Sequence, residues 1–146
     1  VEIKAGLKGL TVRDALITQF YQVDANQGLG SVYQLMLSTG QSTIPVASNG
    51  AFLGIVRRVD LMKALQRLGD RAPAYAAIGD EPEGISLGQP LAEVLPKFKG
   101  SRILPVLEGR TLVGLVTSES IQQCLWINKH QRKIGDQPPE ENVTQV

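Results

Sequence analysis

The sequence predicts a mixed α/β fold (α+β) built from two similar repeats, and two observations carry this prediction. A Pro-Val pair in a strand-like segment occurs at 45–46 and again at 105–106, 60 positions later. A glycine followed by two apolar residues occurs at 54–56 and again at 114–116, with the same offset. Upstream, apolar residues match at an offset of 62 positions: Leu16 with Ile78, Val23 with Ile85, Leu29 with Leu91 and Val32 with Val94. An ordered series of matches at a nearly constant offset indicates an internal duplication.

The first repeat begins with a short helix and an extended piece. Thr11 has the hydroxyl of an N-cap residue, and Asp14 follows three positions later, close to a capping box. Residues 21–23 are predicted to be extended. From Leu29 to Met36 the apolar spacing is that of a helix.

A hairpin and a second helix complete the first repeat. Two apolar runs at 43–47 and 51–56 flank Asn49-Gly50, which favours a type I′ turn because both residues tolerate positive φ. Gly69 suits the end of the following helix. The apolar residues predicted on one face of that helix are Leu61, Met62, Leu65 and Leu68.

The second repeat is predicted to follow the same order. A short helix at 73–78 and an extended piece at 84–86 lead to a helical stripe at 91–98, where Pro96 predicts a kink or an early end. A hairpin then turns at Glu108-Gly109, and a last helix carries Ile121, Cys124 and Leu125 on its apolar face. The predicted boundaries are 8–70 for the first repeat, 71–131 for the second and 132–146 for a polar, disordered tail.

Composition and charge limit the classes of function. Apolar residues make up 42% and charged residues 20%, which is typical of a soluble globular protein. A formal net charge of +1 gives no indication of nucleic-acid binding or of electrostatic attachment to a membrane. No apolar run reaches the roughly 20 residues of a membrane span, and a single cysteine, Cys124, excludes an internal disulfide. We therefore expect a cytoplasmic protein, and the absence of an initiator Met suggests a fragment of a longer one.

The duplicated β-α-β-β-α unit, with Pro-Val opening one strand and apolar-x-Gly-apolar-apolar in the next, resembles the CBS domain over roughly residues 10–129. This resemblance implies that the two repeats pack through their sheets into one pseudo-two-fold disc, a Bateman module. It implies that two discs form a homodimer. It also implies that the clefts between the repeats bind an adenosyl ligand such as AMP, ADP, ATP or S-adenosylmethionine.

The residues after the glycine motif give such a cleft its chemistry. A helix N-terminus presents free N–H groups to a phosphate, and apolar residues beside the prolines offer a dry wall for adenine. In the family a Thr or Ser follows the Gly-apolar-apolar step, and an Asp three residues later accepts both ribose hydroxyls. Here the pattern is split, because the first repeat has Arg57 and Asp60, whereas the second has Thr117 and Ser120.

Because the pattern is split, three alternatives remain: the chain has one nucleotide-binding site, a weak one, or none. Arg57 can bind phosphate as a charged donor. Ordinary N-cap or first-turn chemistry is the structural alternative for Asp60 and Thr117. The predicted nucleotide-binding residues are Val23, Ile44, Pro45, Arg57, Asp60, Ile85, Arg102, Leu104, Pro105, Thr117 and Ser120.

Other reactive residues have simpler interpretations. His130, the only histidine, has no partners nearby for a metal site or a catalytic base and is expected on the surface. Cys124 is expected to be a buried, inert thiol. Trp126 and Ile127 either complete the core or form an exposed apolar patch. We predict no metal site and no catalytic residue.

The opening stretch 10–20 resembles the start of the CBS pair that follows the membrane core of bacterial site-2-type zinc metallopeptidases. This resemblance implies that the chain is attached to a host protein with a catalytic or membrane domain. The present chain is not itself expected to insert into the membrane. Three hypotheses follow: a module that senses an adenosine nucleotide, a ligand-free dimerisation or interaction module of the same fold, and an enzyme. The last ranks lowest because no nucleophile–base or metal constellation is visible.

Overall fold

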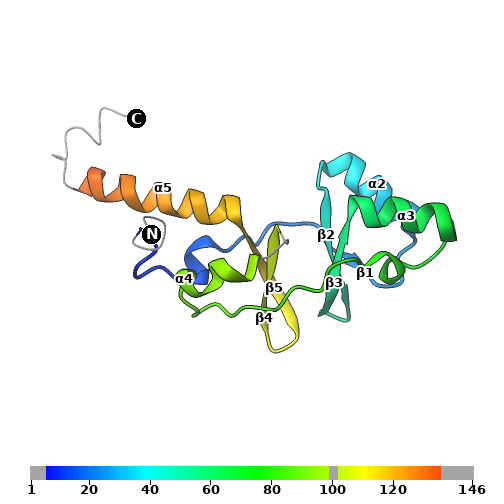
Figure 1. The fold of residues 1–146 in the computed structure, drawn as a ribbon, viewed down its shortest axis with the longest axis horizontal. Helices are drawn as coiled ribbons and strands as arrows, with labels where there is room; N and C mark the ends of the chain where they lie inside the picture. Colours follow the sequence, from blue (N-terminus) through cyan, green and yellow to red (C-terminus); the bar gives the residue numbers. More distant parts are fainter. Residues whose placement is uncertain (1–5, 99–101, 136–146) are drawn as a thin grey trace.

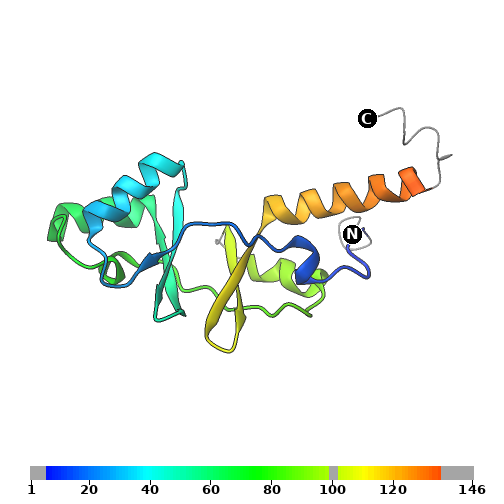
Figure 2. The same cartoon turned by 180° about the vertical axis from the view of Figure 1, so that it is seen from behind.

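The computed structural model describes residues 6–98 and 102–135 and has the predicted mixed α/β fold (Figures 1 and 2). The first repeat contains η1 (Val12–Ala15, a 3-10 helix), β1 (Val23–Asp24), α2 (Leu29–Thr39), β2 (Thr43–Ser48), β3 (Ala51–Arg57) and α3 (Arg58–Leu68). The second contains η2 (Ala74–Ala77, 3-10), α4 (Leu91–Val94), η3 (Leu95–Phe98, 3-10), β4 (Ile103–Glu108), β5 (Thr111–Thr117) and α5 (Ser118–Gly135).

The structure confirms three local predictions that depend on backbone chemistry: a helix cap, a turn and a helix end. The N–H of Thr11 donates to the Asp14 carboxylate at 2.8 Å, as expected at the start of η1. Asn49 and Gly50 both have positive φ, 52° and 84°, at the turn between β2 and β3. Helix α4 ends before Pro96 and continues as 3-10 turns, because proline has no N–H for an α-helical hydrogen bond.

Helix α5 extends further than the sequence predicts. It continues to Gly135, so the predicted start of the tail at residue 132 falls inside this helix. The remainder of that predicted tail, 136–146, lies outside the described residues. Within the part of the chain that the structure describes, no helix combines the length and the apolar character needed to cross a membrane.

The described strands form one sheet in the order β1-β2-β3-β5-β4, and its two hairpins share their irregularities. In the first hairpin the register shifts at Val46/Ala47, and in the second it shifts at the equivalent Val106/Leu107. The parallel pairing of Val23 with Val46 likewise returns as a bridge between Ile85 and Val106. The duplication seen in the sequence is therefore a duplication of strand pairing as well.

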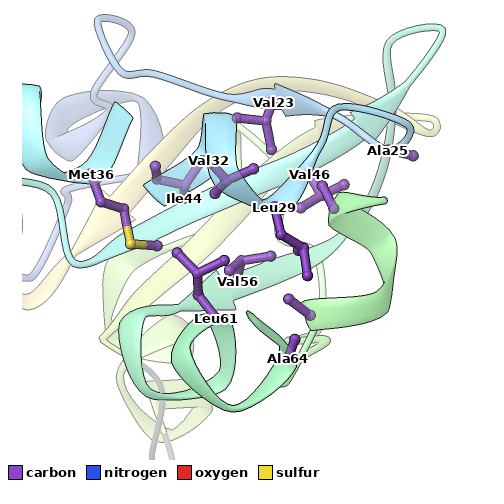
Figure 3. Close-up of a cluster of buried hydrophobic side chains, with 12 residues drawn as sticks. Val23, Ala25, Leu29, Val32, Met36, Ile44, Val46, Val56, Leu61 and Ala64 are labelled. Atoms are coloured by element: carbon purple, nitrogen blue, oxygen red, sulfur yellow. The ribbon is translucent and has the colours of Figure 1, made fainter. Parts of the chain in front are cut away.

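Each of the two large hydrophobic clusters receives a short helix from the other sequence repeat. The first cluster, drawn in Figure 3, combines α2, β2, β3 and α3 with Ala74 and Ala77 from η2. The second combines α4, β4, β5 and α5 with Val12 and Ala15 from η1. Backbone bonds tie these exchanged helices down, since the N–H of Ala74 donates to Gln27 and the N–H of Val12 donates to Gln89. The packed halves consequently do not coincide with the predicted repeats 8–70 and 71–131.

A smaller cluster joins the two halves. Ile55, Ile103 and Leu115 are buried together, with Phe20 and Phe52 packed beside them. At the hairpin tips β3 pairs with β5 through Ala51 and Thr111. Because both halves contribute to this cluster and to the sheet, the halves are in direct contact where β3 meets β4 and β5.

The apolar face predicted on α3 is only partly buried. Leu61 is fully buried, whereas Met62 is 39% and Leu68 is 50% exposed. Consecutive helical residues point about 100° apart, so the face that meets the sheet includes Leu61 and Ala64 and leaves Met62 at its margin. On α5, Trp126 and Ile127 are exposed, which resolves their two interpretations in favour of a surface position. The predicted burial of Cys124 is confirmed, and burial raises the pKa of its thiol, with a smaller contribution from Asp14.

Candidate functional site

A cavity of about 300 Å³ lies where both hairpins begin and α3 starts. Ser42 and Thr43 line it from the start of β2, and Arg102 and Ile103 line it from the start of β4. The remaining lining residues are Ile55, Arg57, Arg58, Val59 and Asp80. Residues from both repeats therefore enclose this cavity, which we call the inter-repeat cleft, and it has the volume of a small ligand pocket.

The linker after η2 forms one wall of the cleft because β3 holds it by backbone bonds. The N–H of Ile55 donates to the carbonyl of Asp80 at 2.8 Å, and the N–H of Gly79 donates to the carbonyl of Ile55 at 3.1 Å. Gly54 permits this approach, since a Cβ atom there would lie 2.5 Å from the Ile78 side chain. The glycine of the repeated motif is thus required for close packing of the linker on the strand.

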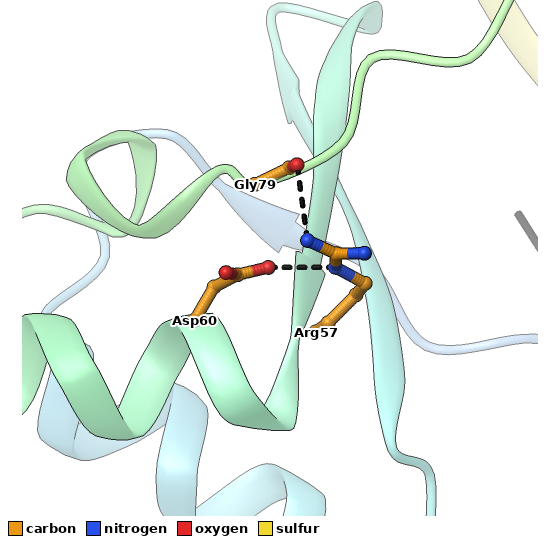
Figure 4. A network of polar contacts seen from close by, with 3 residues as sticks. All are labelled: Arg57, Asp60 and Gly79. Carbon is orange, nitrogen blue, oxygen red and sulfur yellow. Dashed lines mark hydrogen bonds and ion pairs between the residues drawn. The ribbon is translucent and has the colours of Figure 1, made fainter. Parts of the chain in front are cut away.

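Arg57 and Asp60 form an ion pair at the start of α3 (Figure 4). The Arg57 Nε donates to the Asp60 Oδ2 at 2.7 Å, and its Nη2 donates to the carbonyl of Gly79 at 3.3 Å. The hydrogen bond and the charge of Asp60 raise the pKa of Arg57 above its usual value, and the charge of Asp80 adds to the rise. Arg57 stands where the resemblance implies a Thr or Ser hydroxyl. It therefore binds the carboxylate of Asp60, three residues later.

The equivalent residues of the second repeat serve the start of α5. Thr117 and Ser120 exchange hydrogen bonds, with the Ser120 N–H donating to Thr117 Oγ1 at 2.9 Å and the Thr117 N–H donating to Ser120 Oγ at 3.0 Å. Ser120 is buried, and its hydroxyl also donates to the carbonyl of Thr117. These are the bonds of a reciprocal cap, so the structural alternative for Thr117 is present in the fold.

The structure brings some of the predicted site residues together and separates others. Arg57 and Arg102, from different repeats, both line the inter-repeat cleft, and Asp60 lies beside Arg57. The apolar residues predicted to contact the ligand are instead buried in the hydrophobic clusters or strands: Val23, Ile44, Pro45, Ile85, Leu104 and Pro105. Their role as ligand contacts stays a prediction.

Sequence reasoning missed several lining residues. Side chains alternate across a strand, so with Ile44 buried in the core, Thr43 points away from that face and toward the cleft. The same alternation places Ile103 in the cleft and Leu104 in the second cluster. This period-two pattern was available in the sequence. Asp80 carried no local signal, because a backbone bridge to β3 places it there.

The described part of the chain also contains His, Cys, Asp and Glu side chains, the types that bind metal ions. Within residues 6–98 and 102–135 no group of three His, Cys, Asp or Glu side chains is arranged to hold a metal ion. His130 stacks on Trp126 with a centroid distance of 3.7 Å, and its Nδ1 lies 2.8 Å from the Trp126 carbonyl. Since a carbonyl only accepts, Nδ1 carries the proton in this contact.

Comparison with protein families finds the same duplication that the fold shows. A family model described as the CBS domain matches residues 12–67 and again residues 80–126. No curated protein matches the chain.

Several solved structures share the fold. CBSX2, solved in complex with AMP, is 19% identical with a TM-score of 0.72, and the match covers 83% of this chain and 99% of that one. The CBS domain pair of protein MJ0100, solved with 5′-methylthioadenosine and S-adenosyl-L-methionine, is 21% identical with a TM-score of 0.65, covering 77% and 97%. The CBS domain of a bacterial CNNM/CorC family Mg²⁺ transporter, solved with ATP, is 17% identical with a TM-score of 0.73, covering 85% and 92%. At these identities the likeness shows the fold.

Proposed function

This chain belongs to the CBS-domain family, and from that premise we propose that it is a regulatory module that binds an adenosine nucleotide in the inter-repeat cleft. The observation that carries the proposal is the cleft itself, about 300 Å³ in volume, with arginines from both repeats in its lining. Three relatives of the same fold hold AMP, ATP or S-adenosylmethionine in their structures, which supports an adenosine ligand here.

The position of the cleft suggests how binding controls a larger host protein. A ligand that contacts Thr43 and Arg57 on one side and Arg102 and Ile103 on the other connects the two halves. Such a ligand binds more tightly to the arrangement of the two halves in which both sets of contacts form. It shifts the population of the protein toward that arrangement by the difference between its affinities for the two arrangements. We place the module in the cytoplasm. The comparisons do not support the metallopeptidase host, and the proposal names no host.

Calorimetric melting of the chain with AMP, ADP, ATP, S-adenosylmethionine and GTP tests this proposal. A ligand present at about 100 times its dissociation constant stabilises the native state by about 2.7 kcal/mol, so an adenosine ligand is expected to raise the melting temperature clearly. Arg102→Gln is expected to reduce this rise. Arg110→Gln, at the opposite end of the second hairpin, serves as the matched control and is expected to keep it.

A ligand-free dimerisation module is the second candidate, and exposed apolar side chains favour it. Val59 and Met62 are exposed on α3, and Trp126 and Ile127 are exposed on α5. No rise in melting temperature with any nucleotide at millimolar concentration, together with a dimer in sedimentation equilibrium, would replace the sensing proposal with this one.

A further inference from the structure

The lining of the inter-repeat cleft is strongly basic for its size. Arg57 and Arg58 lie at the junction of β3 and α3, and Arg102 immediately precedes β4. Asp80 is the acidic residue in the same lining. Three arginines and one aspartate therefore line a cavity to which both sequence repeats contribute. Guanidinium groups bind phosphate oxygens through pairs of charge-assisted hydrogen bonds.

Asp60 is not among the residues that line this cleft. Its carboxylate accepts from Arg57 Nε and rests on Gly79, where a Cβ atom would lie 1.9 Å from Oδ2. It is also part of the lining of a separate cavity of about 170 Å³ that includes Lys63 and Arg67. The carboxylate best suited to accept two ribose hydroxyls is thus bound by Arg57 (Figure 4). It is also absent from the lining of the larger cavity.

Arg57 has donors left after these contacts. A guanidinium carries five N–H groups, and the bonds to Asp60 and to the Gly79 carbonyl use two of them. The side chain of Arg57 is 40% exposed and lines the cleft. The ion pair consequently orients Arg57 while leaving N–H groups for an anion in the cleft.

We infer that the inter-repeat cleft selects its ligand by phosphate charge, through Arg57, Arg58 and Arg102, and does not read the ribose hydroxyls through Asp60. The ligand class is a nucleotide with several phosphates, a nucleoside triphosphate in preference to a monophosphate. S-adenosylmethionine is disfavoured, because its sulfonium and ammonium groups would meet the three arginines as like charges. This inference rests on the proposed function and adds to it which part of the nucleotide is recognised.

Isothermal titration calorimetry of the chain with ATP, dATP and AMP at fixed ionic strength tests the inference. ATP is expected to bind about ten-fold tighter than AMP or more, because each added phosphate gains charge-assisted hydrogen bonds. The affinities of ATP and dATP are expected to agree within about two-fold. The 2′-hydroxyl that dATP lacks makes no hydrogen bond to Asp60 under this inference, so removing it costs little affinity. Equal affinities for AMP and ATP, or a loss of about ten-fold with dATP, overturn the inference while the proposed function stands. If none of the nucleotides binds, both fall.

Two variants test the assigned residues directly. Arg102→Gln is expected to reduce the preference for ATP over AMP, and Arg110→Gln is expected to leave it unchanged. Arg57→Thr removes the partner of Asp60 and places a good N-cap residue at the start of α3, so this variant is expected to bind dATP about ten-fold more weakly than ATP. An Arg57→Thr chain that keeps its native circular dichroism and binds ATP but still does not distinguish the two nucleotides overturns the role given to the Arg57–Asp60 pair. An unchanged preference for ATP in Arg102→Gln overturns the role given to the arginines.

Discussion

Replacing Leu61 by Ala is expected to lower the free energy of unfolding by about 2–5 kcal/mol, the range for deleting a fully buried leucine side chain from a packed core. Leu61 is 0% exposed and belongs to the first hydrophobic cluster, with Met36 and Val56 (Figure 3). The substitution removes its contacts with α2 and β3 and leaves a cavity. Urea denaturation followed by circular dichroism measures the change.

Met62→Ala is the matched control for this prediction. Met62 follows Leu61 on the same helix but is 39% exposed and lies outside the clusters, so its truncation is expected to cost less than about 1 kcal/mol. Equal losses for the two variants would contradict the burial pattern of α3.

Replacing Gly114 by Ala is expected to lower the free energy of unfolding by about 1–3 kcal/mol, the usual cost of forcing extra atoms into a packed site. A Cβ atom at this position would lie 2.3 Å from Leu16 Cδ1 and 2.8 Å from the carbonyl oxygen of Ile17. Ile17 exchanges two backbone hydrogen bonds with Leu115, at 2.8 and 2.9 Å. The methyl group therefore pushes the segment after η1 away from β5 and weakens the connection of the exchanged helix.

Gly88→Ala provides the comparison for Gly114→Ala. Nothing lies within 4 Å of a Cβ atom at Gly88, and its φ is outside the positive region. The same urea experiment is expected to give a midpoint within error of the unchanged chain. A stable Gly114→Ala protein would show that residues 16–17 do not pack on β5 as described.

The fold was predictable because each repeat carries local signals that agree with one another. Asn49-Gly50 and Pro96 act through their own backbone chemistry, so their effects are visible in the sequence and are confirmed. The exchange of η1 and η2 between the halves was not predictable, since it depends on long-range contacts such as those of Val12 and Ala74. The apolar pattern of a short helix does not indicate which of the two clusters it packs against.

The candidate site was predictable in part. Arg57 was identified from the repeat motif and Arg102 from its position at the predicted strand start before Pro105, and the structure places both in the lining of the cleft. The consequence of Arg57 for Asp60 was not visible, because it requires the geometry of an ion pair three residues apart and the close approach of Gly79. Ile44 and Leu104 are buried in the two hydrophobic clusters, and their assignment as ligand contacts stays a prediction.

The most direct test of nucleotide binding in the inter-repeat cleft is an NMR titration of the ¹⁵N-labelled chain with ATP. Amide shifts are expected to concentrate at Thr43, Ile55, Arg58 and Ile103, around the cleft. The amides at the hairpin tips, such as Asn49 and Gly109, are expected to stay in place because they lie at the other end of the strands. A spectrum unchanged at millimolar ATP, or shifts confined to the far end of α5, would contradict the account.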